Sequence, residues 1–160
     1  MTIQVGDKLP SIDLQYKTED GVQTINSDEL FGGKKVVLFA LPGAFTPTCS
    51  ASHLPGYVVN SDKLFAKGID KIICLSVNDA HVMRAWGEDQ NVEDRIMMIA
   101  DGNADFTRAI GLEIDRSEAG MGLRSQRYAM IVNDGVVELL NLETPGAFEI
   151  SDAETILSSL

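Results

Sequence analysis

The sequence predicts an α/β fold in which helices flank a mixed central β-sheet. Two observations support this class. Apolar, β-branched runs alternate with amphipathic helical patterns, and the alternation closes with a hairpin and a terminal helix. Since no internal repeat, low-complexity tract or linker interrupts this pattern, we expect residues 1–160 to form a single domain.

The strands are predicted from short apolar runs. The run KKVVLFAL at 34–41 lacks alternating polar residues, which is typical of a strand covered on both faces. The run KIICLSV at 71–77 has the same character, and RIMMIA at 95–100 shows it less strongly. The segment 127–142 holds two apolar runs around Asn133-Asp134-Gly135, which indicates a β-hairpin.

Helical patterns fill the intervals between these strands. They predict helices at 79–90, 103–112 and 151–160, and a longer helix from Pro47 to about Lys67. Pro55-Gly56 should kink or break the long helix. Asp79 is the expected N-cap of the helix at 79–90, and Ser151 with Glu154 forms a capping box for the last one.

Composition and charge argue against several classes of protein. A chain of 160 residues can bury a core without metal or disulfide staples. The net charge of −11 and the lack of a basic block argue against nucleic acid or an anionic membrane as partners. No run approaches the ~20 apolar residues that span a bilayer, and the N-terminus lacks signal-peptide features. Because Cys49 and Cys74 do not make a disulfide framework, we expect a reducing, cytoplasmic location.

The segment PGAFTPTCS at 42–50 predicts a reactive cysteine. Thr46 can act as an N-cap, and Pro47 suits the first helical position, where its missing N–H costs nothing. Cys49 then falls in the first turn, where unpaired backbone N–H groups and the helix dipole favour a thiolate. Thr46 and Thr48 add hydroxyls that can donate to the sulfur or orient an oxidant. The alternative is a small buried apolar residue, but such a residue needs neither the threonine nor the proline.

The same residues resemble the active-site segment of the peroxiredoxins, Pro-x-x-x-Thr-x-x-Cys, whose fixed places are occupied by Pro42, Thr46 and Cys49. The stretches PGAFTPTCSASHLPGY, CLSVNDAHVMRAW and RYAMIVNDG resemble the atypical type II branch. The resemblance runs from about Val5 to the C-terminus. It implies a thioredoxin-like fold and the reduction of hydrogen peroxide or alkyl hydroperoxides through a sulfenic acid at Cys49. Thr46 would then help to activate the thiol, and Pro42 would shield and shape the pocket.

The family also places an arginine beside the thiolate, at the start of a strand, and Arg127 matches that position. The topology agrees. If strand 128–133 runs antiparallel to strand 36–41, its beginning lies at the sheet edge where the loop after 36–41 starts, next to Cys49. Arg124 is a second candidate. The alternative for either arginine is a solvated surface cation.

Four further residues enter the predicted site. Gly43, Thr48 and His53 are expected to bind or orient the substrate. His53 follows Cys49 by one helical turn, so it is either the base of a Cys–His pair or, as we favour, an orienting residue that contacts backbone or substrate. Cys74 lies in a strand that reads as buried on both faces, which favours a structural thiol over a second redox cysteine.

The resemblance also bears on reductant and partners. The chain lacks the C-terminal resolving cysteine of animal members, so the sulfenic acid is expected to be reduced by an external thiol, either glutathione with glutaredoxin or thioredoxin. No cofactor is expected, and no metal, because two histidines and two distant cysteines offer no ligand spacing.

Type II relatives often dimerise through the face that carries this loop, so we expect a homodimer. Phe45 would shield the thiolate or meet the second subunit. Trp86 reads as a core or interface residue, and Gly120-Met121-Gly122 as a loop near the site.

Three other functions are weighed against peroxidase. A thioredoxin-type disulfide oxidoreductase would need a second cysteine close to the first, and the Ser-Ala-Ser after Cys49 supplies none. An acyl-hydrolase using Cys49 and His53 would turn over esters without a reductant. A redox sensor or chaperone-like thiol protein would be oxidised at Cys49 without steady-state turnover.

Overall fold

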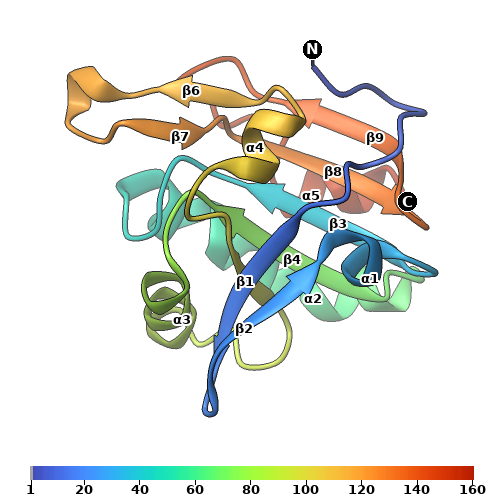
Figure 1. The fold of residues 1–160 in the computed structure, drawn as a ribbon. Helices are drawn as coiled ribbons and strands as arrows, with labels where there is room; N and C mark the ends of the chain where they lie inside the picture. Colours follow the sequence, from blue (N-terminus) through green and yellow to red (C-terminus); the bar gives the residue numbers. More distant parts are fainter. Residues whose placement is uncertain (1) are drawn as a thin grey trace.

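A mixed seven-stranded sheet forms the centre of the computed structural model, which describes residues 2–160 (Figure 1). The strand order is β2-β1-β5-β4-β3-β8-β9. The strands are β1 (Asp13–Thr18), β2 (Gly21–Asn26), β3 (Lys35–Ala40), β4 (Lys71–Ser76), β5 (Met97–Ala100), β8 (Tyr128–Asn133) and β9 (Val136–Leu142). β3, β4 and β5 are mutually parallel and the other pairs are antiparallel, which confirms the predicted mixed sheet.

Helices cover both faces of this sheet. They are α1 (Ser27–Phe31), α2 (Leu54–Ala66), α3 (Ala80–Asp89), α4 (Asp105–Ala109) and α5 (Ala153–Ser158). Val37 and Phe39 of β3 belong to the core that includes α2, α3 and α5, whereas Val36 and Leu38 belong to the core of α1 and α4. Because alternate residues of a strand point to opposite faces, a central strand needs an unbroken apolar run, as β3 has.

The long helix runs without interruption from residue 47 to 66 and changes its hydrogen-bond pattern ahead of Pro55. A π-helical turn, η1 (Cys49–His53), ends where the N–H of Leu54 donates to the carbonyl of Cys49. Pro55 has no N–H, and its ring crowds the carbonyl four residues earlier, so a wider turn accommodates it. The predicted kink or break is therefore a local π turn, and this turn includes Cys49.

The last helix is capped differently from the prediction. Its N-cap is Asp152, whose carboxylate accepts from the N–H of Thr155 at 3.2 Å. Ser151 instead donates its N–H and hydroxyl to Glu143, at 2.8 and 2.7 Å. The predicted capping box of Ser151 and Glu154 is wrong because the carboxylate of Glu143 takes both donors of Ser151.

Another cap shortens the helix predicted at 103–112. Ala104 is left-handed (φ 61°), and α4 begins only after it. The carboxylate of Asp101, at the end of β5, accepts from the N–H groups of Phe106 and Thr107 at 3.1 and 2.8 Å and so caps α4 from outside the helix. The N-cap predicted for Asp79 is confirmed, since its side chain accepts from the N–H of Val82.

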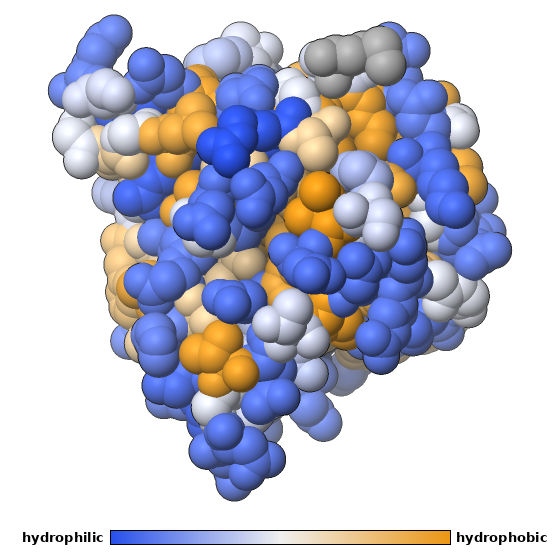
Figure 2. Space-filling view, in the orientation of Figure 1, coloured by the Kyte–Doolittle hydropathy of each residue, from blue (hydrophilic) through white to orange (hydrophobic). Residues whose placement is uncertain are grey.

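Several of the observed strands and helices were not predicted from the sequence. The hairpin β1–β2 and α1 precede the first predicted strand, and β6 (Glu113–Asp115) pairs with β7 (Leu123–Ser125) in a separate two-stranded sheet. Within residues 2–160, no helix has the length and apolar character needed to cross a bilayer. Figure 2 shows a face that is largely hydrophilic, with apolar side chains grouped between charged ones.

Candidate active site

The pairing of β3 with β8 brings Cys49 and Arg127 together. The two strands are antiparallel with Ala40 opposite Tyr128, so the residue before Tyr128 lies beside the loop that leaves β3. Nη2 of Arg127 donates to Sγ of Cys49 at 3.2 Å. The juxtaposition therefore follows from the register that the sequence predicts.

Cys49 is the third residue of the helix that begins at Pro47, and its side chain is fully buried. Burial alone fits a packing thiol. A guanidinium at hydrogen-bond distance, however, is a partner that a thiolate needs and a packing thiol does not. The local arrangement is therefore that of a reactive cysteine.

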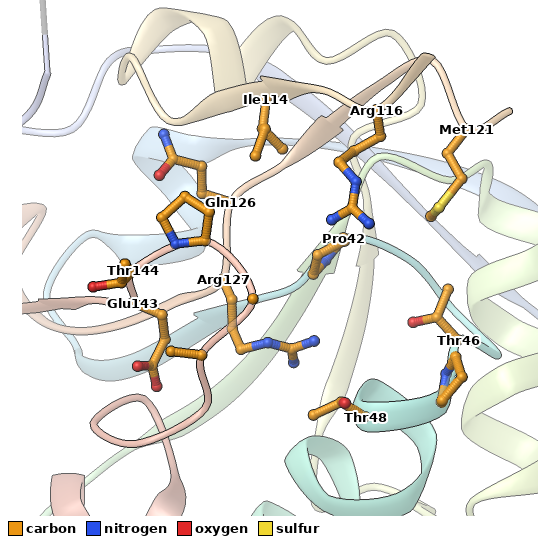
Figure 3. A pocket seen from close by; sticks show the side chains of 14 residues that line it. Pro42, Thr46, Thr48, Ile114, Arg116, Met121, Gln126, Arg127, Glu143 and Thr144 are labelled. Atoms are coloured by element: carbon orange, nitrogen blue, oxygen red, sulfur yellow. The ribbon is translucent and has the colours of Figure 1, made fainter. Parts of the chain in front are cut away.

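Thr46 precedes this helix but does not cap it through its side chain. Its hydroxyl donates to the carbonyl of Gly43 at 2.7 Å, and no N–H of residues 47–50 donates to the hydroxyl. The predicted side-chain N-cap is therefore wrong: in the described part of the chain, the only hydrogen bond of the Thr46 hydroxyl joins it to the loop before the helix and not to a helix N–H. Thr46 still lines the pocket (Figure 3), where Oγ1 can accept a hydrogen bond but has no proton left for the sulfur.

His53 is held as a neutral imidazole between two partners. Nη1 of Arg127 lies 2.7 Å from Nδ1, and Nε2 lies 3.1 Å from the carbonyl oxygen of Ser151. Because arginine only donates, Nδ1 must accept, and Nε2 carries the proton that goes to Ser151. Burial, together with the charge of Arg127, lowers the pKa of His53 from 6.5 to about 3. The basic nitrogen thus faces Arg127 rather than Cys49, which does not suit a Cys–His pair and leaves His53 an orienting residue.

Glu143 supports this arrangement indirectly, through the turn that carries Ser151. Its Oε2 accepts the N–H groups of residues 149–151, each at 2.8 Å, and the hydroxyl of Ser151. Burial raises the pKa of Glu143, but these hydrogen bonds outweigh burial and the pKa is lowered. The turn that they fix presents the Ser151 carbonyl to His53, so a chain of contacts runs from Glu143 to Arg127. Sequence reasoning misses Glu143, because a carboxylate that collects loop N–H groups has no characteristic spacing.

A pocket of about 300 Å³ lies beside the helix start and is lined by Arg127, the residue that contacts the Cys49 sulfur (Figure 3). One side is formed by the loop and helix start that carry the cysteine and by Arg127. The opposite side comes from the β6–β7 hairpin and from the loop after β9. The lining residues are Pro42, Thr46, Pro47, Thr48, Ile114, Arg116, Met121, Gln126, Arg127, Glu143 and residues 144–147. The glycine-flanked Met121 therefore lies at the site, as the sequence predicts.

Gly43 marks the closest approach of the β6–β7 hairpin to the loop that precedes the helix. A Cβ on Gly43 would lie 2.8 Å from Nη1 of Arg124 and 3.2 Å from Cγ2 of Thr46. Arg124 donates to the carbonyls of Met121 and Pro42, at 2.9 and 3.3 Å. Arg124 thus holds the loop, whereas Arg127 contacts the sulfur.

Cys74 lies in β4, in the same apolar core as Cys49, and neither cysteine forms a disulfide. Burial, with a smaller effect of Cys49, raises the pKa of Cys74 well above its ordinary value. Within residues 2–160, no group of three His, Cys, Asp or Glu side chains is arranged to hold a metal ion.

Two aromatic residues flank the helix start. Trp86 is buried, as predicted, and its Nε1 donates to the hydroxyl of Ser50 at 3.0 Å. Phe45 is left-handed (φ 62°) and about half exposed, and its ring centroid lies 6.4 Å from that of Trp86. Phe45 does not line the pocket, so the predicted shielding of the thiolate by Phe45 is not present in the single chain. Its contact with a second subunit stays a prediction.

Comparisons with known proteins agree with this geometry. The chain matches the Redoxin family over residues 4–157. It is 52% identical to chloroplastic peroxiredoxin-2E-2 of Oryza sativa subsp. japonica, over 99% of this chain and 73% of that protein. It is 44% identical to peroxiredoxin-2D of Arabidopsis thaliana, over 99% of this chain and 98% of that protein. The crystal structure of reduced Prx3 in complex with hydrogen peroxide from Vibrio vulnificus is 58% identical, covers 99% of both chains and superposes with a TM-score of 0.95.

Proposed function

Because the chain belongs to the peroxiredoxins, thiol-dependent peroxidases of the Redoxin family with a thioredoxin-like fold, we propose that its substrates are hydrogen peroxide and alkyl hydroperoxides, reduced at Cys49. The observation that carries the proposal is the 3.2 Å contact between the Cys49 sulfur and Arg127, which itself lines the pocket. The hydrogen peroxide bound to the similar Vibrio vulnificus protein supports the choice of substrate.

In the proposed reaction, the Cys49 thiolate attacks the terminal oxygen of the hydroperoxide. An S–O bond forms, the O–O bond breaks, and the sulfur is oxidised to the sulfenic acid. The other oxygen leaves with the electron pair of the O–O bond, takes a proton and departs as water or alcohol. Arg127 stabilises the negative charge that spreads from sulfur to the leaving oxygen. Oγ1 of Thr46 accepts the O–H of the substrate, and Pro42 bounds the site beside it.

We also propose that an external thiol completes the cycle. One thiol condenses with the sulfenic acid, which releases water and leaves a mixed disulfide; a second thiol then attacks the sulfur of the first, forms a disulfide with it and releases Cys49 as the thiolate. Cys74 is buried and unbonded in β4, so it is not assigned this step. Glutathione with glutaredoxin, or thioredoxin, would serve as the reductant, and no cofactor enters the cycle. The functional unit is proposed to be a homodimer.

The test follows peroxide loss by the parent and by Cys49→Ser, with glutathione and glutaredoxin or with thioredoxin as the reductant. We expect steady turnover by the parent, the mass gain of one oxygen atom on Cys49 when the reductant is omitted, and no turnover by Cys49→Ser. Turnover by Cys49→Ser would remove Cys49 from the mechanism. A parent that consumes only one equivalent of peroxide would point to a redox sensor or chaperone-like thiol protein instead.

A further inference from the structure

Arg116 turns a guanidinium toward the pocket from the side opposite to Thr48 and the start of the helix (Figure 3). It lies between β6 and the short helix η2 (Ser117–Ala119) and lines the pocket. In Figure 3 its side chain descends from the hairpin toward Pro42. The reaction proposed above gives this cation no role.

Within residues 2–160, the Arg116 guanidinium has no protein partner. The ion pairs of the structure use other cations, and no hydrogen bond of the Arg116 side chain is formed. The one acidic residue in the pocket lining, Glu143, directs its carboxylate away from Arg116 in Figure 3 and spends Oε2 on residues 149–151. Arg116 therefore offers a free bidentate donor to whatever enters the pocket.

The pocket is also larger than hydrogen peroxide requires. A water molecule occupies about 30 Å³ of liquid, and hydrogen peroxide, with one more oxygen atom, less than twice that, whereas the pocket measures about 300 Å³. A volume of this order accommodates a small organic ligand. Ile114 and Met121 flank Arg116 in Figure 3, and Ala147 adds a further apolar side chain to the lining. The pocket thus combines apolar lining residues with two guanidinium groups, that of Arg127 at the cysteine and that of Arg116 on the hairpin side.

We propose that the pocket selects organic hydroperoxides that bear a carboxylate, which Arg116 holds while the hydroperoxyl group lies at Thr46 and Arg127. This proposal rests on the peroxidase function proposed above and names its substrate class. Bidentate pairing between guanidinium and carboxylate supplies both affinity and orientation. Cys49 is oxidised as before, and the product is the alcohol of the same carboxylic acid.

The overall charge of the protein strengthens the argument for a dedicated cation. At −11, the protein repels anions at long range, so an anionic substrate gains little from electrostatic steering. A fixed cation within a partly enclosed pocket can still bind the anion at contact distance. The carboxylate should therefore be recognised at Arg116 and nowhere else on the approach.

The experiment compares two probes of nearly the same shape, para-carboxy cumene hydroperoxide and its methyl ester. The second-order rate constant of Cys49 oxidation is measured without reductant by rapid quench and mass spectrometry. Arg116→Gln removes the cation. Arg108→Gln is the matched control, because Arg108 is an exposed cation paired with Asp105 outside the pocket. Hydrogen peroxide serves as the internal reference.

We expect the parent and Arg108→Gln to react faster with the acid than with the ester. Arg116→Gln should lose about tenfold in rate with the acid and remain unchanged with the ester and with hydrogen peroxide. Equal losses with acid and ester, or a parent-like preference for the acid, would overturn the proposal while leaving the peroxidase intact. Failure of hydrogen peroxide to oxidise Cys49 in the parent would instead overturn the proposed function.

A second arm separates the substrate from the reductant, because glutathione also carries carboxylates. Oxidised parent and oxidised Arg116→Gln are reduced with glutathione and, separately, with uncharged dithiothreitol. We expect equal reduction rates for the two proteins with either thiol. A defect of Arg116→Gln seen only with glutathione, with acid and ester oxidation unchanged, would assign the cation to the reductant and overturn the proposal.

Discussion

Nδ1 of His53 lies 2.7 Å from Nη1 of Arg127. The pair holds only while the imidazole is neutral, because a protonated Nδ1 has no lone pair left for the guanidinium. His53 is also fully buried, and its other nitrogen faces the carbonyl of Ser151. The free energy of unfolding should therefore depend on pH in the way expected of a buried histidine that stays neutral in the folded protein.

We predict that His53 makes the protein less stable as the solution becomes acidic. Burial and Arg127 lower its pKa from 6.5 to about 3, so between these values the unfolded chain binds a proton that the folded chain does not. Above pH ~7 both states are neutral, and the contribution is constant. Below it, the free energy of unfolding should fall by up to about 1.4 kcal/mol per pH unit from this residue alone.

Urea denaturation of the parent, His53→Gln and His81→Gln between pH ~7 and ~4 measures this effect. His53→Gln should show a shallower fall than the parent, because the residue no longer titrates. The exposed His81 is the matched control and should leave the slope unchanged. Equal slopes for the parent and His53→Gln would show that His53 is protonated in the folded protein.

Arg127→Lys should slow Cys49 oxidation although it keeps the positive charge. Arg127 reaches Cys49 and His53 with two different nitrogens, and a lysine ammonium cannot reproduce that fork. The second-order rate constant with hydrogen peroxide should drop by about 100-fold. Arg84→Lys, at an exposed helix ion pair, is the control and should react like the parent. If Arg127→Ala were oxidised as fast as the parent, Arg127 would have no part in the mechanism.

The predicted position of Arg127 beside Cys49 has a physical basis. The apolar runs of 34–41 and 127–142 predict buried strands, and one antiparallel register then fixes which residue meets the loop after the first strand. Local helix rules also predict the placement of Cys49 near a helix start. Patterns of this kind are reliable where burial or backbone geometry dictates residue type.

The supporting contacts were not predictable in the same way. Glu143 meets residues 149–151 because a loop folds back onto it, and no periodicity marks such a turn. Thr46 had two acceptor choices, and only the local backbone decided for Gly43. The hairpin β1–β2 is half-exposed and polar, and its turn residues, Glu19 and Asp20, are a weak hairpin signal.

Glu143→Gln should destabilise the protein by about 2–3 kcal/mol at neutral pH, because a charged acceptor of several buried N–H donors becomes a neutral amide. The lowered pKa of Glu143 means that this stabilisation is complete above its ordinary pKa and fades as the pH falls through the folded value. The free energy difference between parent and variant should therefore shrink in acid.

Denaturant unfolding at neutral and acidic pH provides the measurement. Glu138→Gln, on the strand β9 that precedes Glu143, is the matched control, because Glu138 is exposed and, among residues 2–160, its carboxylate contacts only side chains, those of Lys35 at 3.9 Å and Asn133 at 3.3 Å. Its cost should stay below about 1 kcal/mol. A Glu143→Gln variant as stable as Glu138→Gln would mean that the turn at 149–151 holds without the carboxylate.

Gly43→Ala should lower the rate of Cys49 oxidation by displacing its neighbours. The added Cβ meets Nη1 of Arg124 at 2.8 Å and Cγ2 of Thr46 at 3.2 Å, so one of these side chains must move. We expect a rate loss of about tenfold with hydrogen peroxide, of the size that small misplacements of catalytic groups produce. Gly56→Ala, where a Cβ meets nothing within 4 Å, should react like the parent.

A double variant identifies which neighbour is displaced. If Arg124 is the obstacle, Arg124→Ala should recover part of the rate lost in Gly43→Ala, because the long side chain no longer blocks the new methyl group. If Thr46 is the one that moves, the two losses should add. A Gly43→Ala variant with the parent rate would show that the loop yields without disturbing the site.

Cys74→Ala should keep both the oxidation of Cys49 and turnover with an external thiol. Burial raises the pKa of Cys74 and keeps its thiol protonated, so it is a poor nucleophile toward a sulfenic acid. The variant should lose about 1 kcal/mol of stability through the small cavity left in β4.

Peptide mapping of peroxide-treated parent should show sulfenic acid or an adduct on Cys49 and no bridge to Cys74. A bridged peptide, together with slower turnover of Cys74→Ala, would make Cys74 the resolving cysteine and require β4 to open during the cycle.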